Sequence, residues 1–226
     1  KHFLMKNLSK IFITAIMLLA CVSVQAQSSA DEMLKRRCAD KVKQMCDYIE
    51  YMAIEMFTGN TDLLNVKRYR NPNTDGKWRW VLFDMDWAFY TDTNSITRWL
   101  TPGGMGTNKF TDNTLFIACM KNATFRDKFL TYIGEHMATT YSSEAVVGKI
   151  RERYSVLLPL LPDQLERWNK TMSSYNSALK AFVTYAEERP MKLIGYFQGD
   201  KTLKLTDAQM QKYFGAAMEA AQNYSR

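Results

Sequence analysis

Histidine and cysteine are scarce in this chain of 226 residues, which holds two histidines and four cysteines. The histidines, His2 and His136, lie far apart, and no Cys or His residues have the spacing of a zinc site. Cys38 and Cys46 are eight residues apart, and on one helix this separates them by about 12 Å, too far for a disulfide. We therefore expect free thiols, buried or half-buried, in place of a zinc centre or a disulfide framework.

The sequence also has no dense cluster of Lys and Arg residues. The formal net charge is +7, from 30 Lys and Arg against 23 Asp and Glu. No stretch has the Lys/Arg density that nucleic-acid binders use, so we expect no nucleic-acid partner. Hydrophobic residues make up 46% and charged residues 23% of the chain, which is typical of a folded globular protein. The length fits one domain.

The beginning of the chain has the layout of a bacterial secretory signal. A basic segment precedes an apolar run at residues 11–20, which is too short to span a bilayer, and a small-residue cleavage site ends at Ala26. This predicts a signal peptide over residues 1–26 and a secreted or cell-envelope protein of residues 27–226. The alternative is a lipobox ending at Cys21, whose acylation would hold the protein on a membrane surface, and membrane association is expected only in that case.

Apolar residues at helical spacing follow the leader. They recur at three- and four-residue steps and predict one buried helix face, formed by Val42, Met45, Cys46, Ile49, Met52, Ala53 and Met56. Gly59 and Asn60 then predict the helix end, because glycine adopts the left-handed cap conformation at little cost. Asp62 should therefore lie in a loop just past a helix.

The second half of the chain is expected to be almost entirely helical. A polar segment at residues 90–111 is expected to be a mobile loop, and Thr206 with Gln209 predicts a capping box. The predicted helices are 113–121, 124–138, 143–158, 162–168, 173–188 and 206–221, with a break at Pro159 and Pro162. The residues expected to pack in the core are Phe125, Phe129, Tyr132, Ile133, Tyr175, Leu179, Phe182 and Val183.

Between these helical regions the sequence predicts a β-hairpin. Two strand candidates, residues 65–70 and 77–83, flank a segment at 71–76 that is dense in turn-forming residues. A turn centred between Asn73 and Thr74 would place Asn65 opposite Leu82 and Asp62 opposite Met85.

The open end of this hairpin is the candidate site. Asp62, Asn65, Asp84 and Asp86 would meet there, and their carboxylate and amide oxygens suit a hard cation such as Mg²⁺. Carboxylates this close repel each other unless a cation neutralises them or one of them holds a proton. Each residue taken alone is also explained as a turn former, a strand start or a helix cap. The combination is harder to explain in that way, because acidic residues that alternate with large apolar ones are costly to place without a partner.

These residues carry a family resemblance. The relevant segments are Gly59-Asn60-Thr61-Asp62, then Asn65, then Gly76-Lys77-Trp78-Arg79-Trp80-Val81-Leu82-Phe83-Asp84-Met85-Asp86-Trp87-Ala88-Phe89. Leu115-Phe116, Asn122 to Phe129, Glu166-Arg167-Trp168 and Glu188-Arg189-Pro190 fit as well. Over residues 42–197 the chain resembles the spore coat protein H (CotH) family of secreted kinases, most specifically at Asp84-Met85-Asp86-Trp87.

The resemblance implies an α+β, mainly α fold: the C-terminal lobe of an atypical protein kinase, with a short β-hairpin that carries the metal site. Asp62 resembles the catalytic aspartate that orients the substrate hydroxyl, while Asn65, Asp84 and Asp86 match the metal ligands. The implied cofactors are Mg²⁺ (or Mn²⁺) and ATP, and the implied partner is a protein substrate at the cell surface or envelope. The resemblance assigns no residues to ATP contacts.

One feature departs from that pattern. A kinase of this family has a nucleotide-covering N-terminal lobe, and no glycine-rich loop or strand lysine precedes Asp62 here. We therefore expect a C-lobe alone, and this expectation does not decide whether the lobe is an active enzyme. One alternative is a non-catalytic surface or adhesion module that binds through exposed aromatic residues such as Tyr90 and Trp99. A further alternative takes Asp84-Met85-Asp86 as the metal motif of a glycosyltransferase, but no doubly wound strand-helix pattern surrounds it.

Overall fold

The computed structural model describes residues 42–60, 66–90, 94–104 and 113–224. The expected signal peptide, Cys21, Cys38, Asp62 and Asn65 lie outside the described residues. The elements are α3 (Val42–Thr58), β1 (Lys67–Arg70), β2 (Trp78–Val81), α4 (Ser95–Leu100), α5 (Thr114–Lys121), α6 (Ala123–Ala138), α7 (Ser143–Leu157), the 3-10 helix η1 (Leu158–Leu160), α8 (Leu161–Arg167), α9 (Met172–Gly199) and α10 (Asp207–Tyr224). The fold is mainly helical with a small antiparallel sheet, as predicted.

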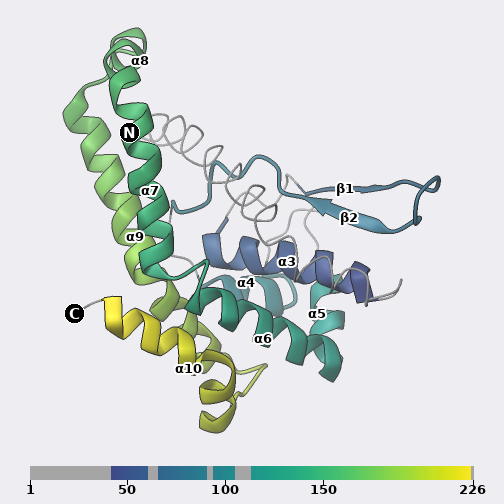
Figure 1. Ribbon diagram of the computed structural model, residues 1–226. Coiled ribbons are helices and arrows are strands. Elements are labelled where there is room, and N and C mark those ends of the chain that lie inside the picture. The colour runs from purple at the N-terminus through teal and green to yellow at the C-terminus, as the bar shows by residue number, and fades with distance from the viewer. Residues whose placement is uncertain (1–41, 61–65, 91–93, 105–112, 225–226) are drawn as a thin grey trace.

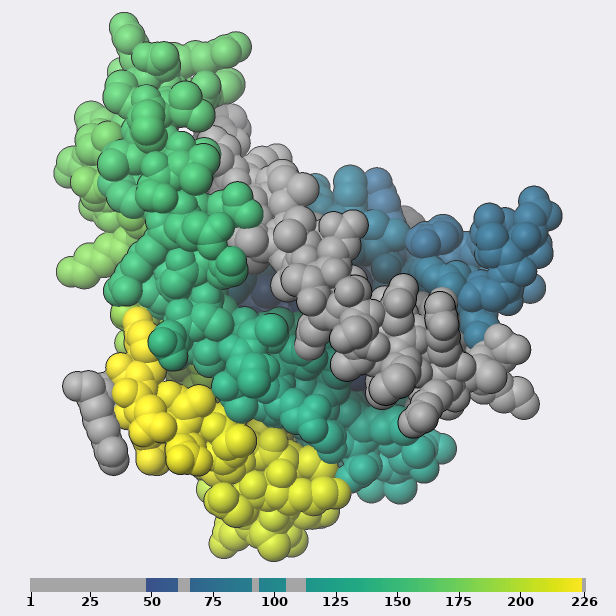
Figure 2. Space-filling view, viewed as in Figure 1, coloured from purple at the N-terminus to yellow at the C-terminus, as the bar shows by residue number. Residues whose placement is uncertain are grey.

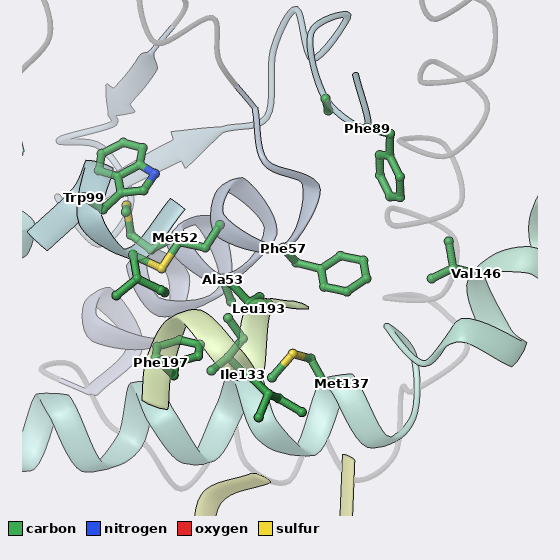
Figure 3. Close-up of a cluster of buried hydrophobic side chains, with 14 of the residues drawn as sticks. Met52, Ala53, Phe57, Phe89, Trp99, Ile133, Met137, Val146, Leu193 and Phe197 are labelled. Carbon is green, nitrogen blue, oxygen red and sulfur yellow. The ribbon is translucent and has the colours of Figure 1, made fainter. Parts of the chain in front are cut away.

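Helix α3 lies at the centre of the molecule and packs against α4, α6, α9 and the hairpin (Figure 1). Figure 3 shows its Met52, Ala53 and Phe57 meeting side chains of α6 and α9 in the main core. Met52, Ala53 and Met56 have no exposed surface, which confirms the predicted apolar face over the residues whose side chains are described. The central helix is thus fixed on several sides at once.

The remaining helices form two pairs around α3. Helix α10 packs along α6, and α7 runs beside α9, with α8 at the far end of this second pair (Figure 1). Phe125, Phe129, Ile133 and Tyr175 are buried, and the other predicted core residues of these helices are partly buried against them. The predicted Thr206 and Gln209 capping box is confirmed, with both reciprocal backbone contacts present. None of the described helices combines the length and the apolar character needed to cross a membrane.

Two predictions about these helices were wrong. Helix α9 continues through Pro190 to Gly199, where the sequence predicted an end at Glu188. The turns beyond Pro190 bury Leu193, Ile194 and Phe197, and this burial offsets the lost N–H and the steric clash of proline inside a helix. Part of the expected loop at 90–111 is helix α4, which Asn94 caps by accepting a hydrogen bond from the Thr97 amide.

Cys119 is a free, half-buried cysteine, as expected for the thiols. Burial raises the pKa of its thiol, so it carries little thiolate at neutral pH.

The β-hairpin projects from the body beside α3 (Figure 1). Its strands are shorter than predicted and its register differs by one residue, since Lys67 lies opposite Val81 and Arg70 opposite Trp78. The turn explains the difference: the Asn71 carbonyl accepts hydrogen bonds from the amides of both Thr74 and Gly76, which makes a wide connection that includes Lys77.

Candidate functional site

The C-terminus of α3 is the structural base of the candidate site. Gly59 has a φ of 59°, and the amides of Gly59 and Asn60 donate to the carbonyls of Met56 and Glu55, the hydrogen bonds of a Schellman motif. The predicted helix end is therefore confirmed. The chain leaves this cap directly into residues 61–65, which contain two of the four predicted site residues.

The same helix end holds the segment that carries the other two. The Thr58 carbonyl accepts a hydrogen bond of 2.8 Å from the Phe89 amide. The Asn60 side-chain amide contacts the Glu55 carboxylate at 2.9 Å and the Met85 sulfur at 3.3 Å. Residues before and after the hairpin are thus both fixed to the last turn of α3.

The segment from Asp84 to Phe89 has an unusual backbone. Asp84 and Phe89 have φ angles of 51° and 56°, in the left-handed region that side chains other than glycine rarely adopt. The Phe89 ring is 7% exposed and lies against the rings of Phe57, Phe182 and Tyr185. Strain of this kind persists only where the surroundings fix the backbone, and it concentrates at functional sites.

The two acidic residues of this segment differ in exposure. Asp84 is exposed, whereas Asp86 is 6% exposed. Strand β2 ends at Val81, so the alternation that the sequence suggested does not extend to these residues. Asp84 therefore lies at the surface, whereas Asp86, two residues later, lies within the protein.

The predicted four-residue oxygen cluster is placed only in part. Asp84 and Asp86 lie past the end of β2, at the base of the hairpin, while Asp62 and Asn65 fall outside the described residues. No group of three or more His, Cys, Asp or Glu side chains that could hold a metal ion is present among residues 42–60, 66–90, 94–104 and 113–224. The complete metal site stays a prediction.

A buried polar network on α3 supports this base and was not predicted. Glu55 is 4% exposed and accepts hydrogen bonds from Asn60 and from the Tyr51 hydroxyl. Burial, and then the charge of Glu55, raises the pKa of Tyr51 well above its usual value, so the hydroxyl remains a donor at all ordinary pH values. The sequence could have indicated this pair, because Tyr51 and Glu55 are four residues apart in a predicted helix and therefore lie on the same side of it.

Arg189 is the second feature that the sequence did not reveal. Its side chain has no exposed surface and reaches from α9 to the end of α3 and to α4. Nε donates to the Phe57 carbonyl at 2.8 Å, and one terminal nitrogen donates to the Met56 carbonyl and to the Ser95 hydroxyl, both at 2.6 Å. An arginine beside a proline at a predicted helix end gave no indication of complete burial.

Of the two aromatic residues expected to be exposed, Trp99 is buried and Tyr90 is partly exposed. Trp99 is 4% exposed and lies edge-on to Phe116, with ring centroids 6.3 Å apart, so it belongs to the core. Its position on α4, which the sequence read as loop, explains the error. The ring of Tyr90 lies edge-on to that of Trp87, with ring centroids 5.3 Å apart.

Comparison with protein families places most of the chain in a known family. The family model described as CotH kinase protein matches residues 31–193, more than half of the chain. The matched region includes α3, the hairpin, Asp84, Asp86 and Arg189. No curated protein and no solved structure matches the chain.

Proposed function

The chain belongs to the CotH kinase family, and on this premise we propose that it is a secreted or cell-envelope protein that transfers phosphate from ATP to a protein hydroxyl. The observation that carries the proposal is the backbone at Asp84. Asp84 is exposed and has a left-handed backbone, and the segment that it begins ends at Phe89, whose amide donates a hydrogen bond to Thr58 of α3. The same helix end leads directly into residues 61–65, so both halves of the site start from one rigid element.

The residue roles follow from what phosphoryl transfer requires. The reaction needs a positioned hydroxyl and neutralised phosphate oxygens, and little covalent participation by the protein. Asp62 accepts a hydrogen bond from the substrate hydroxyl and orients its oxygen. Asn65, Asp84 and Asp86 are the proposed ligands of Mg²⁺ or Mn²⁺, which neutralises the charge on the phosphate oxygens of ATP when bound.

The oxygen-bearing side chains of the described site residues are of the kind that binds such an ion. Mg²⁺ prefers carboxylate and amide oxygens and takes only one or two carboxylates from the protein. The exposed Asp84 supplies one oxygen ligand, and the Asn60 amide, through Met85, restrains the backbone between Asp84 and Asp86. Residues that contact the nucleotide base are not proposed.

Replacing Asp84 by alanine should lower phosphate incorporation by about 100-fold, because loss of one charge-stabilising group at a reacting phosphate typically costs this much. Asp62→Ala should give a loss of similar size. The measurement is transfer of labelled phosphate from ATP to a serine-rich acceptor protein, or to the chain itself, with Mg²⁺ and with Mn²⁺.

Asp163→Ala is the matched control, since Asp163 is an exposed aspartate on α8. It should retain the full signal. Equal incorporation by the wild type, Asp62→Ala and Asp84→Ala would contradict the proposal, as would incorporation that does not require a divalent cation.

The second candidate is the non-catalytic surface module, and the far end of the α7 and α9 pair favours it. Leu160 and Trp168 are 60% and 57% exposed there, although large apolar side chains are usually buried. A magnesium-dependent rise in melting temperature with ATP would argue for the kinase. Capture of an envelope protein that requires neither ATP nor magnesium, and that Trp168→Ala abolishes, would argue for the module.

A further inference from the structure

The β1–β2 hairpin concentrates positive charge on a projecting element. Residues 66–83 hold five Lys and Arg residues and one acidic residue, Asp75. This excess of four positive charges compares with +7 for all 226 residues. The sequence showed no long basic stripe because a six-residue turn segment separates the cations of β1 from Lys77 and Arg79, and the folded hairpin brings the two groups together. The hairpin projects beyond the rest of the surface in Figure 2.

The single acidic residue of the hairpin is already paired. Asp75 accepts two hydrogen bonds from the Arg79 guanidinium, at 2.9 and 2.6 Å, and one from the Lys77 amide. This pairing lowers the pKa of the Asp75 carboxyl well below its usual value, so it stays charged and bound to Arg79. It therefore does not neutralise the cations of β1.

The three cations on β1 are exposed, and two of them lie over aromatic rings. Lys67 Nζ lies 3.2 Å from the centre of the Phe83 ring, and the Arg68 guanidinium lies 5.8 Å from that of Trp78. Arg70 is exposed as well. Within the described part of the chain, no carboxylate forms an ion pair with any of these three side chains. Because these side chains are exposed and an aromatic ring does not neutralise their charge, they can attract an anionic ligand.

The outer edge of β1 is the second independent feature. All four residues of β1 are exposed, and β1 pairs only with β2 in the described sheet. Residues 66–70 make no backbone hydrogen bond outside the hairpin to any other described residue. An open strand edge of this kind presents amides and carbonyls that can pair with an added extended chain.

We propose that the β1 edge of the hairpin binds an acidic polypeptide segment in extended conformation. The peptide backbone pairs with the outer edge of β1, and its Asp or Glu side chains, at every second position, lie beside Arg68 and Arg70. These two arginines share one face of the strand because they are two residues apart. The open edge favours a polypeptide over a nucleic acid, because phosphates only accept hydrogen bonds and cannot pair with the carbonyls that alternate with the amides along a strand.

The position of the hairpin connects this binding to the proposed function. The hairpin joins residues 61–65 to Asp84 and Asp86, so a segment docked on β1 lies next to the candidate site. The docked protein would then also be the one that is phosphorylated, and this step rests on the proposed function. The binding itself requires neither ATP nor a metal ion, so it is tested separately.

The test is fluorescence anisotropy of a labelled peptide of alternating glutamate and threonine, titrated with the full chain in the absence of ATP and divalent cations. The double variant Arg68→Glu with Arg70→Glu should bind about tenfold more weakly, equivalent to about 1.4 kcal/mol. Arg68→Gln with Arg70→Gln should be intermediate. The control, Lys128→Glu with Lys180→Glu, changes the net charge equally at exposed helix positions and should bind as the wild type does.

Further arms distinguish the mode of binding. A peptide with proline at alternate positions cannot pair with a strand edge and should bind poorly, and raised salt should weaken the binding. Equal affinity of the wild type and the glutamate variant, with unchanged circular dichroism, would overturn the proposal. So would equal binding of the proline-containing peptide, or tighter binding of a single-stranded oligonucleotide of the same charge.

Discussion

Replacing Arg189 by methionine should lower the free energy of unfolding by about 3 to 5 kcal/mol. Methionine keeps an apolar stem of similar length, so the change removes chiefly the donors. The Phe57 carbonyl and the Ser95 hydroxyl then remain buried without the hydrogen bonds that Arg189 donates, while the Met56 carbonyl keeps the Gly59 amide. Each buried group that loses its partner costs about 1 to 3 kcal/mol. Urea denaturation followed by circular dichroism measures the loss.

The same variant should also loosen the candidate site. Arg189 fixes the last turn of α3, and the Phe89 amide donates to Thr58 in that turn. Hydrogen exchange of the Phe89 amide should therefore accelerate more than exchange in α10. Arg189→Lys keeps the charge but not the planar group that reaches two carbonyls and a hydroxyl, so it should recover only part of the stability. A variant as stable as the wild type, with unchanged exchange at Phe89, would show that the contacts of Arg189 contribute nothing.

The features that the sequence predicted correctly are those specified by neighbouring residues. Gly59 ends α3 because its φ of 59° suits glycine, and Thr206 caps α10 because Gln209 is three residues away. The apolar face of α3 follows from its own periodicity. None of these outcomes depends on which distant element lies alongside, so a local pattern was sufficient.

The features that were missed depend on contacts between distant segments. Helix α9 passes through Pro190 because Leu193 and Phe197 are buried against other helices, and proline alone predicts an end there. Arg189 is buried because the end of α3, more than 130 residues earlier, offers it two carbonyls. Hydrogen bonds at this sequence separation leave no signal in a single sequence.

The candidate site lies between these two cases. The sequence located Asp84 and Asp86 past the second strand, where the structure has them. It treated them as equivalent ligands, whereas Asp84 is exposed and Asp86 is buried. Asp84 begins its segment with a left-handed backbone, and Phe89 ends the segment with a hydrogen bond to Thr58 and contacts to the rings of distant elements. Contacts of this kind are not visible in the local sequence.

A glycine on α6 provides the second large stability effect. Replacing Gly134 by alanine should lower the free energy of unfolding by about 3 kcal/mol, because added volume in a packed interface forces elements apart. A Cβ at this position would lie 1.9 Å from the carbonyl oxygen of Tyr213 and 3.0 Å from its carbonyl carbon. Both are backbone atoms of α10, so no side-chain rotation relieves the clash. Urea denaturation measures this loss too.

Gly148→Ala is the matched control, since a Cβ there would have no heavy atom within 4 Å. This exposed position on α7 should gain up to about 1 kcal/mol, because alanine favours the helix more than glycine does. The same substitution should thus have opposite signs at two helical sites, and a loss of stability at both would contradict the close approach of α6 and α10.

Gly134→Ala also separates stability from the arrangement of the site. It weakens the contact between α6 and α10, which includes neither the end of α3 nor the Asp84 segment. At equal global stability, set by adding urea to the more stable variant, Phe89 exchange should be faster in Arg189→Met than in Gly134→Ala. Equal exchange in both would mean that the end of α3 responds only to overall stability, and that Arg189 has no specific role in fixing the last turn of α3.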